Sequence, residues 1–106
     1  MSNTGQKVKD EAIRETAFGD ITSSFVAIGS PLTHDAFNVT FRNDTDTKIY
    51  LSTDGTTSIK KFPEFSDSTY DSKTNDMYRK AGTQFYIKDN GTAATEGAFW
   101  IEVEYV

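Results

Sequence analysis

The chain has 106 residues, with sixteen Asp and Glu against eleven Lys and Arg, and a formal net charge of −5. A chain of this length builds one hydrophobic core, and its acidic composition argues against nucleic-acid binding, which requires a basic surface. It contains no cysteine, which excludes a disulfide or a thiolate site within it. No apolar run approaches the roughly 18 residues of a membrane-spanning helix, and the first residues lack the apolar region of a signal peptide. We therefore expect a small domain that binds neither nucleic acid nor a membrane.

Residues 1–15 are polar and carry mixed charges, which predicts a flexible N-terminal arm in front of a folded domain at residues 16–106. Val8, Ala12 and Ile13 are apolar residues of this arm and would line one or two turns of an amphipathic helix. Such a short helix is marginal on its own in water. Two interpretations stay open: a frayed chain end, or an arm that becomes ordered against a neighbouring subunit.

The clearest strand pattern lies at residues 36–55. Apolar and polar residues alternate through residues 37–42, which is the period of a half-buried strand. A second strand pattern follows at residues 48–53, and the polar run Asn-Asp-Thr-Asp at residues 43–46 separates the two. Two strands joined by a short Asn/Asp turn predict a β-hairpin.

Further strand patterns occur on both sides of this unit, at residues 16–21, 24–28, 57–62, 83–88 and 98–106. Residues 64–76 are the most polar part of the chain and predict an acidic loop. With eight Phe and five Tyr, and Leu only at positions 32 and 51, the core is expected to consist mainly of aromatic rings. Seven or eight short strands separated by Gly, Asp and Asn predict an all-β fold. We expect a single small antiparallel β-sandwich with a jelly-roll or an immunoglobulin-like strand order.

The polar residues offer no recognisable catalytic or metal-binding set. His34 is the single histidine, so a Ser-His-Asp triad would need it as the base, and no Gly-x-Ser-x-Gly sequence supplies an activated serine. Asp44 and Asp46, with Asn43, resemble half of a calcium loop, but the order of Gly and Glu in an EF-hand is missing. Asn and Asp in such a position ordinarily bond to the backbone of their own turn. We expect no catalytic residue, no cofactor and no metal, and hence no enzyme.

The last strand pattern, at residues 98–106, alternates apolar residues with Trp100, Glu102 and Glu104, which therefore share the face directed away from the core. An exposed Trp on a polar strand face is often an interface anchor. The alternative is that both faces of this strand are covered within one subunit. The predicted assembly interface combines the apolar residues of the arm with this outward face: Val8, Ala12, Ile13, Trp100, Glu102 and Glu104.

Five segments between residues 18 and 105 carry a series of turn and strand motifs: FGDITSSFVAIGSPLT at 18–33, NDTD at 43–46, STDG at 52–55, GTQFYIK at 82–88, and the closing strand. In order and spacing these segments resemble a family of small virion structural proteins of tailed bacteriophages, which are encoded among the head and tail genes. The motifs are structural rather than catalytic, so the resemblance implies a structural role and identifies no site.

The resemblance implies a non-enzymatic virion protein that is assembled in the host cytoplasm, and we expect it at the neck or tail, in the head–tail connector region. Its partners would be other virion proteins, such as portal, connector or tail subunits, together with further copies of itself in a homo-oligomer. Two alternatives stay open. One is a carbohydrate- or receptor-binding module of a tail fibre, with Tyr50, Tyr70, Tyr78 and Trp100 as stacking platforms. The other is a capsid decoration protein.

Overall fold

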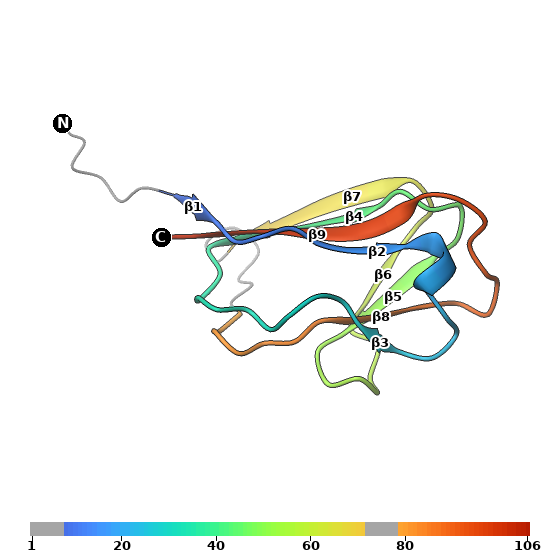
Figure 1. Ribbon diagram of the computed structural model, residues 1–106, viewed down its shortest axis with the longest axis horizontal. Helices are drawn as coiled ribbons and strands as arrows, with labels where there is room; N and C mark the ends of the chain where they lie inside the picture. Colours follow the sequence, from blue (N-terminus) through green and yellow to red (C-terminus); the bar gives the residue numbers. More distant parts are fainter. Residues whose placement is uncertain (1–7, 72–78) are drawn as a thin grey trace.

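The computed structural model describes residues 8–71 and 79–106, and these residues form two antiparallel sheets that pack face to face (Figure 1). The five-stranded sheet contains β1 (Lys9–Asp10), β2 (Arg14–Ala17), β4 (Asn38–Asn43), β7 (Ser66–Asp71) and β9 (Ala98–Tyr105). The four-stranded sheet contains β3 (Val26–Ala27), β5 (Ile49–Ser52), β6 (Lys60–Phe62) and β8 (Tyr86–Asp89). A short 3-10 helix, η1 (Phe18–Asp20), connects β2 towards β3. The predicted all-β sandwich is confirmed, with nine strands in the described part of the chain instead of seven or eight.

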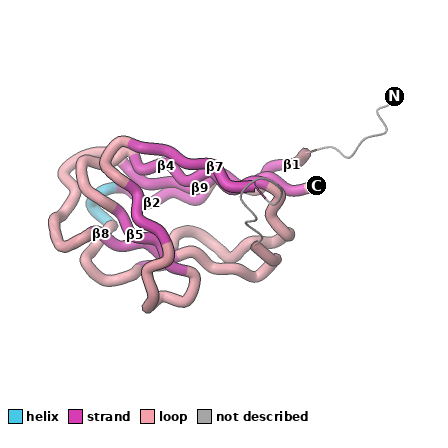
Figure 2. The backbone as a smooth tube through the Cα atoms, turned by 180° about the vertical axis from the view of Figure 1, so that it is seen from behind, coloured by secondary structure: helices cyan, strands magenta, loops and turns pink. Residues whose placement is uncertain are grey.

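The strand order is that of a jelly roll. The sheets have the orders β1-β9-β4-β7, with β2 also pairing with β9, and β3-β8-β5-β6. From β2 to β9, every connection except that between β5 and β6 passes from one sheet to the other (Figures 1 and 2). This alternation gives the interleaved Greek keys of a jelly roll and excludes the immunoglobulin-like alternative.

The core lies between the sheets and has four buried Phe side chains at its centre. Phe41 contacts Phe62 and Phe85, with ring centroids 5.2 and 5.6 Å apart, and Phe62 contacts Phe99 at 5.6 Å. Tilted and edge-to-face ring pairs of this kind contribute roughly 0.5–1.5 kcal/mol each beyond the burial of their area. Aliphatic side chains complete the core: Ile28, Val39, Ile49, Leu51, Ile87, Ile101 and Val103. The predicted aromatic core is therefore confirmed at its centre only, because aliphatic side chains, both Leu residues included, make up the rest of it.

The predicted β-hairpin at residues 36–55 is wrong. The first strand becomes β4 of the five-stranded sheet, and the second becomes β5 of the four-stranded sheet, so the polar run between them is a crossing from sheet to sheet. Asn43 is buried at this crossing, and its amide nitrogen donates to the carbonyl oxygens of Thr47 (2.9 Å) and Pro63 (2.9 Å). Its Oδ1 accepts from the backbone N–H (3.1 Å) and the hydroxyl (2.6 Å) of Thr45. These bonds satisfy a buried polar turn that would otherwise destabilise the core.

The N-terminal region also departs from its prediction. Residues 8–15 form no helix: β1 and the first half of β2 fall within the predicted arm, and both strands pair with β9. The expected boundary between residues 15 and 16 lies inside β2, because this segment completes the edge of the sheet. Residues 1–7 of the predicted arm lie outside the described residues. The predicted strand at 16–21 ends in η1, and the predicted loop at 64–76 contains the edge strand β7.

Candidate functional site

The outer face of the five-stranded sheet carries the polar side chains of its central strands. The register places Glu15 of β2 opposite Trp100 of β9, Trp100 opposite Arg42 of β4, and Arg42 opposite Asp67 of β7. Directly opposite residues share a face of the sheet, so these four residues form one row across it. The outward direction of Trp100, predicted from alternation, is thus confirmed. Glu102 and Glu104, the other predicted interface residues on β9, continue the same face and are half-buried like Trp100.

Hydrogen bonds join the side chains on this face in pairs. Arg42 Nη1 donates to Asp67 Oδ2 (2.8 Å), and Arg42 Nε lies 3.4 Å from Glu102 Oε2. Asn38 Nδ2 donates to Glu104 Oε1 at 2.9 Å. Because the Arg42 ion pairs are exposed to solvent, they contribute little to stability, but they do orient the charged groups around Trp100.

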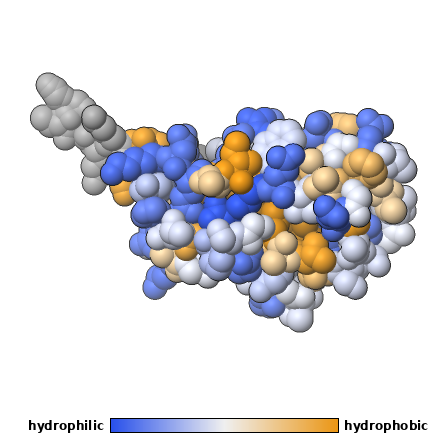
Figure 3. Space-filling view, viewed as in Figure 1, coloured by the Kyte–Doolittle hydropathy of each residue, from blue (hydrophilic) through white to orange (hydrophobic). Residues whose placement is uncertain are grey.

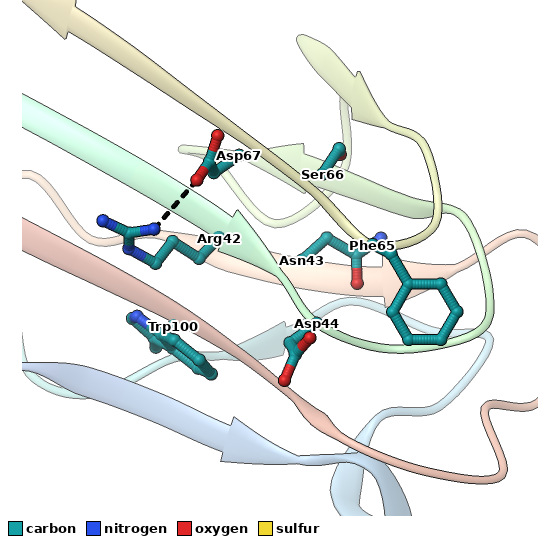
Figure 4. A pocket seen from close by; sticks show the side chains of 7 residues that line it. All are labelled: Arg42, Asn43, Asp44, Phe65, Ser66, Asp67 and Trp100. Carbon is teal, nitrogen blue, oxygen red and sulfur yellow. Dashed lines mark hydrogen bonds and ion pairs between the residues drawn. The ribbon is translucent and has the colours of Figure 1, made fainter.

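A pocket of about 550 Å³ opens beside Trp100, where the outer face reaches the sheet-to-sheet crossing (Figure 4). Trp100 and Arg42 lie on one side of this pocket and Phe65 on the other, with Asp44 between them. Among the described residues, the lining consists of Arg42, Asn43, Asp44, Phe65, Ser66, Asp67 and Trp100. We call it the Trp100 pocket.

Phe65 is held in an unusual backbone conformation at the mouth of this pocket. Its φ angle is 49°, in the left-handed region that bulky residues rarely adopt. Its side chain is 59% exposed, while its backbone N–H donates to the carbonyl oxygen of Thr45 at 3.2 Å. Strained conformations of this kind persist where the surrounding structure imposes them and are frequent at ligand sites. The wall beneath Phe65 is fixed by the buried Asn43 amide described above.

A second polar cluster fixes the N-terminal segment to the loop before β4. The Glu11 side chain is only 4% exposed, and its Oε1 accepts from Arg14 Nη2 at 2.7 Å. Its Oε2 accepts from the backbone N–H groups of Thr33 (3.2 Å) and His34 (2.9 Å) and lies 3.0 Å from His34 Nδ1. The His34 ring stacks on Tyr105 at the end of β9, with centroids 3.6 Å apart. We call this group of residues the Glu11 cluster.

Burial alone would raise the pKa of Glu11, but hydrogen bonds outweigh it. Those from Arg14, His34 and Thr33 together lower the pKa from 4.5 to about 2. Arg14 is itself buried, 5% exposed, and Nε and Nη2 also donate to the carbonyl oxygens of Ser30 (2.8 Å) and Pro31 (3.0 Å). The cluster is therefore a satisfied buried ion pair that anchors residues 8–15, and His34 takes part in it as an orienting group.

The remaining predicted residues lie in separate places. Val8 and Ile13 are 50% and 60% exposed and, with exposed Ala12, follow the β1/β2 edge next to β9. Of the six residues of the predicted interface, three lie on β9 and three lie in the segments that flank β1 and precede β2, and their role in assembly stays a prediction.

The four predicted stacking platforms are not brought together. Tyr50 lies on the four-stranded sheet, and Tyr70 packs against the core. Tyr78 is outside the described residues, which leaves Trp100 alone at the pocket. Sequence reasoning missed Phe65 as a partner of Trp100, because nothing in the local sequence signals its left-handed backbone.

Within residues 8–71 and 79–106, no group of three or more His, Cys, Asp or Glu side chains is arranged to hold a metal ion. No helix in the same residues is long and apolar enough to cross a membrane.

Comparison with known proteins identifies a fold and no family. No family model and no curated protein matches the chain. Among solved structures, it is similar to a chain from Bacillus endospore appendages, described as a novel family of disulfide-linked pili. The similarity covers 100% of this chain and 94% of the other, with a TM-score of 0.51 and 11% sequence identity. At this identity the likeness shows a shared β-sandwich fold alone.

Proposed function

We propose that the chain is a non-enzymatic structural protein of a tailed-bacteriophage virion that acts at the neck or tail, in the head–tail connector region. In this proposal it assembles through the edges of its five-stranded sheet and through its N-terminal segment. The sequence resemblance supplies the class of particle. The observation that carries the assembly mechanism is a pair of edges, β1/β2 and β7, at opposite sides of one sheet, neither of which has an outer partner strand within residues 8–71 and 79–106.

The two edges are complementary in direction. β7 and β9 both run antiparallel to β4, and β2 runs antiparallel to β9, so β2 and β7 point in opposite directions. If a second copy is placed beside the first in the same orientation, β7 of one copy meets β2 of the next as an antiparallel pair. Exposed edges are prone to this kind of pairing. Repeating such a head-to-tail contact generates a ring when the rotation closes.

Pairing through backbone hydrogen bonds needs no continuous apolar patch, and the face drawn in Figure 3 does not present one. In Figure 3, hydrophilic side chains gather at the left and centre of the visible face, and apolar side chains occur in separate patches among side chains of intermediate hydropathy. The structural neighbour belongs to appendages that are disulfide-linked pili, so its fold occurs in an assembled structure. This chain has no cysteine, and its own contacts would have to be non-covalent.

A proline at Ala17 tests the edge contact without disturbing the subunit. The Phe18 N–H donates to Gly97 O at 3.0 Å, so by alternation the Ala17 N–H points away from β9, towards the open edge. Ala17 has φ −68°, which a proline ring adopts without strain. In light scattering over a concentration series, we expect the unmodified protein to form a discrete multimer and Ala17→Pro to shift it to monomer. Ala17→Ser, which keeps the N–H, is the matched control; equal masses for the two variants would contradict edge pairing.

Removing residues 1–7 tests the contribution of the N-terminal end separately. This truncation leaves the Glu11 cluster and β1 in place, whereas removing residues 1–15 would also delete β1 and part of β2. We expect the shortened protein to keep its thermal unfolding midpoint but to form a weaker multimer, measured by its mass on dilution. A multimer as stable as that of the full chain would exclude an inter-subunit role for these residues.

The place in the particle is tested in the phage that carries the coding sequence. Deletion of the sequence should produce filled heads and free tails that fail to join, seen by electron microscopy of the lysate. Complete particles that lack only a surface protein of the head would instead indicate a capsid decoration protein.

A further inference from the structure

We propose that the Trp100 pocket is a binding site for a neutral saccharide, formed by Trp100 and Phe65 with the carboxylates of Asp44 and Asp67. This inference rests on the side chains that line the pocket and not on the assembly proposed above, although two of them, Ser66 and Asp67, belong to the edge strand β7. It starts from the pairing of two accessible aromatic rings with oriented carboxylates in one pocket of about 550 Å³.

The aromatic groups supply flat apolar surfaces on two sides of the pocket. Trp100 projects from β9, and Phe65 from the loop before β7, with Asp44 between them (Figure 4). Phe65 is largely exposed and has a strained backbone, so neither core packing nor local backbone preference accounts for its position. A sugar ring presents C–H groups on its faces and hydroxyl groups around its rim. Aromatic side chains bind such a face through their apolar bodies.

The polar groups select hydroxyl donors and reject anions. The Asp44 carboxylate accepts no hydrogen bond from any described residue, and Asp67 uses one carboxylate oxygen for Arg42. Arg42 is the positive group that the described residues contribute to the lining, and it is already paired with both Asp67 and Glu102. Free carboxylate oxygens accept hydrogen bonds from a ligand. A phosphate, sulfate or sialic acid would meet net negative charge here, whereas the hydroxyl groups of an uncharged sugar would donate to it.

An organic cation is the competing ligand chemistry, since acidic groups and aromatic rings also bind ammonium ions. Trp100 and Phe65 lie on two sides of the pocket, as two rings of an aromatic cage for such an ion would, so the rings fit either ligand. The pocket volume lies in the range of small-molecule sites rather than that of a single ammonium group. The size of the pocket therefore favours a saccharide.

The fluorescence of Trp100 tests the site directly, because it is the only tryptophan in the chain. The full chain is titrated with neutral oligosaccharides of glucose, galactose, mannose and N-acetylglucosamine, and separately with choline and a lysine-rich peptide. We expect a saturable change with at least one neutral oligosaccharide. Phe65→Ala should weaken binding about tenfold, and Asp44→Asn should weaken it as well. Phe18→Ala is the matched control, because Phe18 is an exposed Phe on η1 outside the pocket.

Each outcome of the titrations either supports or overturns the saccharide site. Binding that is weakened by Phe65→Ala and unaffected by Phe18→Ala supports the proposal. No response to any neutral oligosaccharide, or equal weakening by the two variants, overturns it. A response to choline or to the peptide alone also overturns it and assigns the pocket to a cation. Phe65 and Phe18 lie outside β1, β2 and β7, the strands that the assembly proposal uses. The light-scattering test of assembly is therefore independent of the fluorescence test of sugar binding.

Discussion

Replacing Gly97 with alanine should strongly destabilise the fold. Gly97 precedes β9 with φ +86°, and a Cβ there would lie 1.8 Å from the Asp44 carbonyl oxygen and 3.2 Å from the Thr45 Cα. The backbone on both sides is fixed, since the Asp44 N–H donates to Ala98 O at 3.0 Å. The close approach therefore cannot be relieved by moving a flexible side chain. We expect a loss of more than about 4 kcal/mol, which is a large fraction of the roughly 5–15 kcal/mol that stabilises an ordinary domain.

Gly91→Ala is the matched control for Gly97→Ala. Gly91 has φ +101°, but a Cβ there would have no neighbouring heavy atom within 4 Å. It therefore isolates the cost of a positive φ, about 1–3 kcal/mol, from the cost of the backbone contact. Urea unfolding followed by far-ultraviolet circular dichroism measures both. Equal losses for the two variants would show that the crossing between β4 and β5 does not pack against the start of β9 as the structure has it.

The same crossing shows why the strand pairing could not be read from the sequence. Alternation correctly predicted β4 and β9 and the direction of Trp100. The Asn-Asp-Thr-Asp run looks the same locally whether the chain turns back within a sheet or passes to the other one. The crossing to the other sheet is stabilised by the Asn43 side chain, whose partners include the carbonyl of Pro63, twenty residues further along the chain. Such long-range hydrogen bonds leave no local pattern.

The candidate site was predictable to a similar extent. Outward alternation identified Trp100, but Phe65 reaches the pocket only because of its left-handed backbone. The polar sequence of residues 64–76 predicts a loop, because an edge strand such as β7 has little apolar alternation, with Tyr70 as its main apolar contact to the core. Glu11 and Arg14 have the spacing of a helical ion pair. They meet instead on extended backbone, because both also bond to the loop at residues 30–34.

Neutralising Glu11 should remove a large share of the acid sensitivity of this protein. The folded-state pKa of Glu11, about 2, lies below its unfolded value of 4.5. Its carboxylate therefore stabilises the fold above pH 4.5, and this contribution is lost as the pH falls towards 2. A shift of this size corresponds to about 3 kcal/mol at neutral pH. We expect Glu11→Gln to lower the free energy of unfolding by a comparable amount at pH 7 and by little at pH 2.

The quantity to measure is the difference in the free energy of unfolding between the unmodified protein and Glu11→Gln, because other carboxylates titrate in the same pH range. Hydrogen bonds from Thr95 lower the pKa of Asp46, and those from the backbone of Thr57 and Thr56 lower the pKa of Asp54. Both groups remain in Glu11→Gln, so their effects cancel when its urea unfolding curves are subtracted from those of the unmodified protein at each pH. A difference that stays constant from pH 7 to pH 2 would mean that Glu11 acts through its shape alone. A difference that disappears as the carboxylate is protonated would show that its charge, held by Arg14 and the N–H groups of Thr33 and His34, anchors the N-terminal segment to the sheet.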